Sequence, residues 1–166
     1  MPIDIPNFYP DDSGLLFDSM VEGMDTLFVI DTPNVDVLAK QLTTYHSFTG
    51  RVAYHWHAES GLKRFDLPHI TLPRTNQLLD AIYHVANSQH FGIYLFTGFE
   101  DELQKPMALN LLNYFLRSSH VVRKFMIFAG NHPIIPTEME DDFTALRLHS
   151  AEAESEEFAE RNKYLY

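Results

Sequence analysis

The chain has 166 residues, a length typical of one domain with a substantial core, and its formal net charge at pH 7 is −11. An acidic surface repels phosphate backbones, so we do not expect nucleic acid as a general partner. The absence of cysteine excludes disulfides, thiolate metal sites and cysteine nucleophiles. No apolar run is as long as a membrane span, and the acidic, proline-rich amino terminus is unlike a signal peptide. We therefore expect a cytoplasmic protein that does not bind membranes.

Residues 1–14 contain three prolines and are predicted to form an extended or disordered arm, and residues 15–166 a single α/β domain. In that domain, short apolar runs typical of buried strands alternate with segments of helical spacing. The predicted strands cover residues 26–31, 51–56, 91–96, 124–129 and 144–148. The predicted helices start at Thr32, as a cap before Pro33, and at residues 74, 103 and 151. Residues 57–73 are predicted to be mostly a connection.

The alternation of strands and helices predicts the fold class. A chain of this kind forms a parallel sheet with helices on both faces, because each right-handed crossover places its helix against the sheet. We predict a three-layer α/β fold with a parallel sheet of about five strands. The order of elements is that of a P-loop NTPase.

The first strand-to-helix turn, however, lacks the residues of a phosphate site. A P-loop needs glycines that expose backbone N–H groups, a lysine for the terminal phosphates and a Ser or Thr for Mg²⁺. This chain has Asp31, Thr32, Pro33 and Asn34 at that turn, with no glycine and no lysine. Pro33 has no N–H, and the Asp31 carboxylate would repel phosphate. We predict a P-loop-like skeleton without a P-loop and without a nucleotide cofactor.

Two later strand ends give the same indication. Thr97-Gly98 follows the third predicted strand, where an ATPase would carry a metal-binding carboxylate. The acidic pair Glu100-Asp101 comes slightly later and is interpreted as the start of a loop and a helix cap. Asn131 follows the fourth strand, where a polar sensor residue would lie, and is interpreted as a turn former. One hypothesis left open is an atypical nucleotide site that uses Asn131 and Arg123.

The main alternative is a metal site in the sequence HWH. His55 and His57 are two residues apart on a predicted strand, so their side chains share a face and could chelate one divalent metal. Glu59 follows closely and is the candidate third ligand. This pattern predicts a metal-dependent enzyme as the alternative function. The competing interpretation is a pair of structural or surface histidines, since nine histidines make one such pair expected by chance.

The assembled order of segments resembles a known family. The segments that carry the resemblance are VAYHWHAESGL (52–62), FGIYLFTGFEDEL (91–103), LNLLNYFLRSS (109–119), KFMIFAGNHPIIPTEM (124–139) and FTALRLHSAEAESEEF (143–158). Together they resemble the degenerate, non-ATP-binding amino-terminal domain of AAA-family ATPases of the plastid-encoded and cyanobacterial type. The resemblance covers residues 25 to 162. Ser150-Ala151 departs from it, because the family has a proline-containing turn there.

The resemblance implies a function but no catalytic residue. None of the ATP-binding residues of the family has a counterpart in this chain. A domain of this kind is expected to be a non-catalytic module for protein binding, assembly or regulation. Its expected partner is a protein, either an AAA-type ATPase or a second copy of the chain.

Overall fold

The computed structural model describes residues 2–8 and 13–150. Within these residues, seven strands form one sheet: β1 (Ile3–Phe8), β2 (Leu27–Asp31), β3 (Ala53–His57), β4 (Gly61–Arg64), β5 (Gly92–Thr97), β6 (Lys124–Gly130) and β7 (Thr144–Ser150). The α-helices are α1 (Ser13–Glu22), α2 (Val35–Thr49), α3 (Leu78–Asn87) and α4 (Pro106–Arg117). Two short 3₁₀ helices, Glu100–Gln104 and Thr137–Met139, lie in the connections. None of the helices in this part of the chain is long and apolar enough to cross a membrane.

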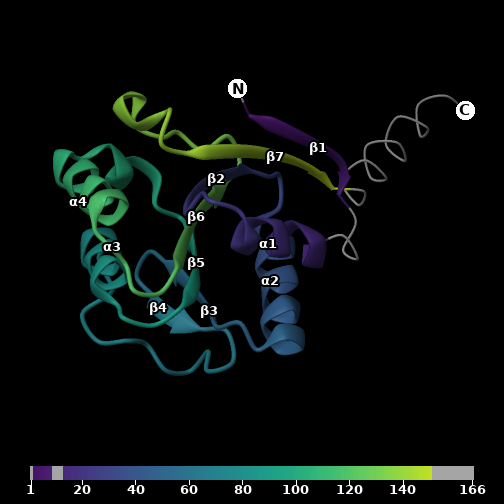
Figure 1. The fold of residues 1–166 in the computed structure, drawn as a ribbon, viewed down its shortest axis with the longest axis horizontal. Helices are drawn as coiled ribbons and strands as arrows, with labels where there is room; N and C mark the ends of the chain where they lie inside the picture. Colours follow the sequence, from purple (N-terminus) through teal and green to yellow (C-terminus); the bar gives the residue numbers. More distant parts are fainter. Residues whose placement is uncertain (1, 9–12, 151–166) are drawn as a thin grey trace, which may run out of the picture.

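The predicted fold class is confirmed. The sheet has the order β1-β7-β2-β6-β5-β3-β4, and every neighbouring pair is parallel except β3 and β4. Helices α1 and α2 cover one face of the sheet, and α3 and α4 cover the other (Figure 1). The three layers and the P-loop-NTPase-like arrangement agree with the prediction, and β1 and β4 extend the predicted five strands at the two edges.

Two apolar clusters, one on each face, explain the long apolar runs of the central strands. Alternate residues of a strand point to opposite faces of the sheet. In β5, Tyr94 and Phe96 pack in the cluster under α3 and α4, whereas Ile93 and Leu95 pack in the cluster under α1 and α2. In a strand that is buried on both faces, apolar residues do not alternate with polar ones, so its sequence is continuously apolar.

The amino-terminal arm contains structure that the sequence did not indicate. Strand β1 pairs in parallel with β7, with Ile3 opposite Leu146 and Ile5 opposite Leu148. Helix α1 follows and buries Phe17 in the cluster under α1 and α2.

Strand β4 lies in the segment predicted as a connection and pairs antiparallel with β3. The helix predicted from residue 151 lies outside the described residues.

Helix α4 begins later than predicted. A 3₁₀ helix occupies Glu100–Gln104, and the α-helix starts at Pro106 rather than near Leu103. Proline is favoured in the first turn of a helix because the N–H that it lacks would have no partner there. Lys105 lies at the cap position of this helix and its side chain makes no capping hydrogen bond, so the start predicted at residue 103 is wrong by three residues.

A buried lysine from β6 binds the carboxyl end of helix α3. The Lys124 side chain is 1% exposed, and its Nζ donates hydrogen bonds to the carbonyl oxygens of Val85 (2.7 Å), Ala86 (2.9 Å) and Ser88 (2.7 Å). The last carbonyls of a helix have no partner within the helix, and a cation there also interacts favourably with the helix dipole. Lys124 is the first residue of β6, so this contact fixes the end of α3 to the amino-terminal edge of the sheet.

Candidate functional site at the carboxyl edge of the sheet

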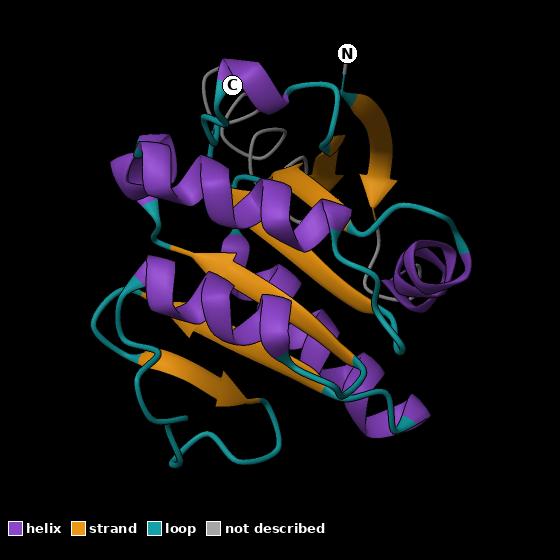
Figure 2. Cartoon of the chain, turned by 60° about the vertical axis from the view of Figure 1, so that its left-hand side comes forward, coloured by secondary structure: helices purple, strands orange, loops and turns teal. Residues whose placement is uncertain are grey.

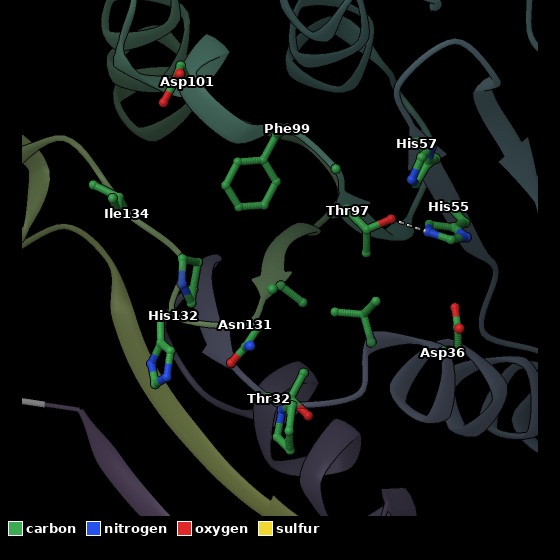
Figure 3. A pocket seen from close by; sticks show the side chains of 16 residues that line it. Thr32, Asp36, His55, His57, Thr97, Phe99, Asp101, Asn131, His132 and Ile134 are labelled. Carbon is green, nitrogen blue, oxygen red and sulfur yellow. Dashed lines mark hydrogen bonds between the residues drawn. The ribbon is translucent and has the colours of Figure 1, made fainter.

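A cleft of about 630 Å³ lies at the carboxyl ends of β2, β3, β5 and β6 (Figure 3). In parallel α/β sheets ligands bind at this edge, next to the strand where the order of the sheet reverses. Here that strand is β2, which lies between β6 and β7. Apolar side chains from Pro33, Val35, Phe99, Pro133 and Ile134 line part of the cleft. Its polar lining consists of Thr32, Asp36, His55, His57, Thr97, Asp101, Asn131 and His132.

In the turn between β2 and α2, the backbone N–H groups of Thr32 and Asn34 already form hydrogen bonds within the protein. The N–H of Thr32 donates to the carbonyl of Gly130 (2.9 Å), and the N–H of Asn34 donates to Thr32 Oγ1 (3.4 Å). The side chain of Asn34 caps α2, where its Oδ1 accepts from the N–H groups of Asp36 (3.1 Å) and Val37 (3.3 Å). The predicted cap, Thr32, is therefore wrong by two residues. In a phosphate site such N–H groups point at the ligand, and here they bind the protein itself.

Asp31 closes the end of β2 by binding two neighbouring segments. Its Oδ1 accepts the backbone N–H of His132 (2.9 Å), and its Oδ2 lies 3.3 Å from Arg147 Nε and 3.3 Å from His132 Nδ1. Arg147 lies in the middle of β7 and His132 follows β6, so the carboxylate links the end of β2 to β7 and to the turn after β6. The Asp31 side chain is 17% exposed, which places this linkage partly inside the protein. We interpret Asp31 as a structural residue at this edge.

Gly98 occupies the position where an ATPase would carry its metal-binding carboxylate. Its φ of 67° is in the left-handed region that favours glycine. A Cβ atom added at Gly98 would lie 2.8 Å from His57 Nε2 and 3.1 Å from His57 Cδ2. Any side chain at this position would therefore collide with the His57 ring. The missing carboxylate is thus part of a local structure in which an imidazole takes the space.

We expect Gly98→Ala to lower the free energy of unfolding by about 1–2 kcal/mol, because alanine is strained at this φ and its methyl group displaces His57. Gly14→Ala is the matched control. Gly14 lies in α1 with no atom within 4 Å of its added Cβ, and alanine there should be neutral or stabilise by up to about 1 kcal/mol. Urea unfolding of the three proteins measures both effects, and equal stabilities would contradict the steric interpretation.

His55 is a half-buried, hydrogen-bonded histidine. Its Nε2 lies 2.7 Å from Thr97 Oγ1, the contact drawn in Figure 3, and its ring stacks on Phe65 with centroids 5.7 Å apart. Burial and, to a smaller extent, nearby His57 together lower the pKa of His55 from 6.5 to about 4, and Asp36 opposes the shift. At neutral pH the imidazole is therefore uncharged.

The structure brings together two of the three predicted metal ligands. His55 and His57 share a face of β3 and both line the cleft. Glu59 does not line it, because it lies in the turn between β3 and β4 with φ 71°. In residues 2–8 and 13–150, no three His, Asp or Glu side chains lie close enough together to hold a metal ion. Metal binding by His55, His57 and Glu59 stays a prediction.

Comparison with protein families identifies the domain. The family described as "SpoVK-like AAA ATPase, N-terminal domain" matches residues 16–148, well over half of the chain. The chain belongs to this family. No curated protein and no solved structure gave a match. The resemblance to the amino-terminal domain of AAA ATPases is thereby confirmed at the level of the family.

In this AAA amino-terminal domain, the hypothesis of a nucleotide site built from Asn131 and Arg123 is wrong. Asn131 follows β6 and lines the cleft, whereas Arg123 precedes β6 at the opposite edge of the sheet. A seven-residue strand spans about 20 Å, too far for one small ligand site. Arg123 instead donates hydrogen bonds to the carbonyls of Val21 (2.6 Å), in the last turn of α1, and Asp25 (3.4 Å), just beyond that helix.

The cleft of the AAA amino-terminal domain also contains residues that the sequence had not singled out as site residues. Asp36, in the first turn of α2, and His132, in the tail of β6, both line it. The sequence could have indicated His132 as a site residue, because it comes just after a central strand and directly follows Asn131. Asp36 gave no such signal, because an acidic residue in a first helical turn is common for reasons of helix stability alone.

Proposed function

We propose that this AAA amino-terminal domain is a non-catalytic, P-loop-like module that binds protein and serves the assembly or regulation of an AAA-type ATPase. The observation that carries the proposal is the turn between β2 and α2. Its N–H groups bond to Gly130, Thr32 and Asn34, and Asp31 is held by Arg147 and His132. A skeleton retained without its phosphate turn supports a role in which the surface, rather than a nucleotide, is recognised.

The charge of the cleft supports the same proposal. Asp36 and Asp101 line it on opposite sides (Figure 3), and no lysine or arginine of the described residues does so. Binding of a nucleoside triphosphate requires cations or exposed N–H groups to offset the phosphate charge. The neutral His55 supplies no positive charge at physiological pH.

Titration with Mg·ATP tests the non-catalytic part of the proposal. We expect isothermal titration calorimetry to detect no binding tighter than about 1 mM, and the melting temperature to stay unchanged at millimolar nucleotide, because a ligand stabilises the state that it binds. Micromolar binding of Mg·ATP would overturn this part of the proposal.

The protein-binding part needs a separate experiment. A SpoVK-like AAA ATPase module, produced on its own, should bind the chain in size-exclusion chromatography or change its rate of ATP hydrolysis when the chain is added. The matched control is Asp31→Asn/Arg147→Gln, which should remove the link between the end of β2 and β7 while leaving the net charge unchanged. If the chain neither binds the module nor changes its rate of ATP hydrolysis, the result contradicts a role with an AAA module.

The alternative is a metal-dependent function at the cleft, favoured by the placement of His55 and His57 in the same lining. Elemental analysis of untagged protein tests it directly. Stoichiometric Zn, Fe or Mn that is lost in His57→Ala would favour the alternative, and metal-free protein would leave the docking module as the better explanation.

A further inference from the structure

The outer surface of helices α3 and α4 is nearly free of charge in a chain that is otherwise strongly acidic. Each helix carries a single Asp, Glu, Lys or Arg residue, which is Asp80 in α3 and Arg117 in α4. The two helices lie side by side on one face of the sheet (Figure 2). We define the α3–α4 face by six exposed residues, which are Asp80, Tyr83 and Asn87 of α3 and Met107, Tyr114 and Arg117 of α4; His84, Pro106 and Asn110 are exposed on the same helices.

These residues share the outward side of their helices. The spacing from Asp80 to Tyr83 and Asn87 in α3, and from Met107 to Tyr114 and Arg117 in α4, keeps each set on one helical face. Tyr83 is 59% exposed, Met107 58% and Tyr114 48%. Tyrosine and methionine are enriched in protein interfaces, so their exposure in one patch marks a docking surface rather than scattered surface residues.

Hydrogen bonds fix the tyrosine side of the α3–α4 face before any partner arrives. Tyr114 Oη donates to Asn87 Oδ1 (3.0 Å), and Asn87 Nδ2 donates to the carbonyl of Tyr83 (2.9 Å). These bonds join the last turns of the two helices and hold the Tyr114 ring against α3. A side chain that is already ordered loses little conformational entropy on binding.

The two charges lie at opposite ends of the face. Helices α3 and α4 run in the same direction, since both lead back to the amino-terminal edge of the sheet, and their ends are joined by the bond between Tyr114 and Asn87. Asp80 lies in the first turn of α3 and Arg117 in the last turn of α4. Neither forms an ion pair with another residue of the described ranges 2–8 and 13–150.

We propose that the α3–α4 face binds a second copy of the same chain about a two-fold axis. A two-fold axis that lies in the plane of the face, perpendicular to the line from Asp80 to Arg117 and through its midpoint, brings the start of α3 in one copy against the end of α4 in the other. Asp80 of each copy then meets Arg117 of the other copy, so the contact contains two ion pairs around a centre of tyrosine and methionine. Such an isologous contact needs a self-complementary surface, and the α3–α4 face is self-complementary in charge. The whole chain has a net charge of −11, so pairing through an acidic part of its surface would instead bring like charges together.

The size of the face sets the strength of the dimer. At 1.5 Å per residue the helices are about 15–18 Å long, and together they are about 20 Å wide, so each copy contributes on the order of 350 Å². A standard stable interface buries about 800 Å² per partner. We therefore expect a reversible dimer with a dissociation constant on the order of 0.1 mM.

Sedimentation equilibrium of the 166-residue chain tests the proposal. The average mass should rise from 19.2 kDa toward twice that value as the concentration increases from about 10 µM to about 1 mM. Asp80→Arg and Arg117→Asp should each weaken association at least about tenfold, since each places like charges in contact. The double variant Asp80→Arg/Arg117→Asp should restore association to within about threefold, because it exchanges the two partners of each pair.

Two further variants separate the α3–α4 face from other routes to association. Tyr83→Glu should abolish the dimer, whereas Phe48→Glu should leave it intact, because Phe48 is 86% exposed but lies on α2 across the sheet. Unchanged fluorescence of buried Trp56 and unchanged circular dichroism confirm the fold of each variant. A chain that stays monomeric at every concentration would overturn the proposal. So would a dimer that Tyr83→Glu leaves intact, or single charge reversals that the double variant does not rescue.

Discussion

Lys124→Met is expected to lower the free energy of unfolding by about 3 kcal/mol, a large part of the stability of a domain of this size. The methionine fills the same space but leaves the carbonyls of Val85, Ala86 and Ser88 without their donor. A buried carbonyl without a partner costs about 1–3 kcal/mol, and the release of the buried ammonium group offsets part of the sum. Urea unfolding followed by the fluorescence of Trp56, the single tryptophan, measures the change.

Lys40→Met provides the matched control, because Lys40 is exposed on α2. The same chemical change there should alter the stability by less than about 0.5 kcal/mol. If Lys124→Met cost no more than the control, the hydrogen bonds to the end of α3 would not stabilise the fold. Hydrogen exchange of the α3 amides should show the same difference locally, with faster exchange in Lys124→Met alone.

The second expected result concerns acid stability and His55. The folded protein holds the pKa of His55 at about 4, whereas the unfolded chain has the ordinary value of 6.5. Above pH 6.5 neither state binds the proton. Between pH 6.5 and 4 the unfolded state binds more protons than the folded state, so stability falls as the pH falls through this window. The pKa difference corresponds to about 3 kcal/mol, and partial exposure of the ring reduces the expected loss to about 2 kcal/mol.

His55→Gln isolates this effect. Glutamine can still bond to Thr97 Oγ1 but does not titrate, so the variant should lose about 2 kcal/mol less than the natural chain between pH 6.5 and 4. The comparison between the two proteins removes the contribution of the carboxylates, which titrate in both. His90→Gln, at an exposed position, should retain the full pH dependence. Parallel stability curves for the natural chain and His55→Gln would show that His55 is protonated equally well in both states.

The sequence allowed the interior of the sheet to be predicted, and its edges were missed. Strands β5 and β6 are buried on both faces, and their continuous apolar runs identify them without further information. Among the described residues, strand β1 has β7 as its one neighbour, and this pairing depends on residues about 140 positions away. Strand β4 has four residues and only one of them, Leu62, is a buried apolar side chain. Short edge strands of this kind depend on tertiary contacts that no local pattern contains.

The candidate site divides in the same way. The loss of the phosphate turn could be read from the residues themselves, since the required glycines and lysine are absent. The contact between Gly98 and His57 could not, because it joins the residue after β5 to the last residue of β3 and depends on the backbone conformation of Gly98. The error over Arg123 had a different source. Arg123 and Asn131 lie at the two ends of one strand, and the direction of that strand was sufficient to separate them.

The order of the strands in the sheet also affects how the chain can fold during synthesis. Among the strands that the structure describes, β2 has β6 and β7 as its neighbours, and β1 pairs with β7 alone. During synthesis β1 and β2 therefore emerge from the ribosome long before the strands that pair with them. The amino-terminal half cannot complete its part of the sheet alone. Completion of the sheet must wait for β7, and contacts between such distant segments form slowly. Until then the apolar strand β2 is a segment that a chaperone would have reason to protect.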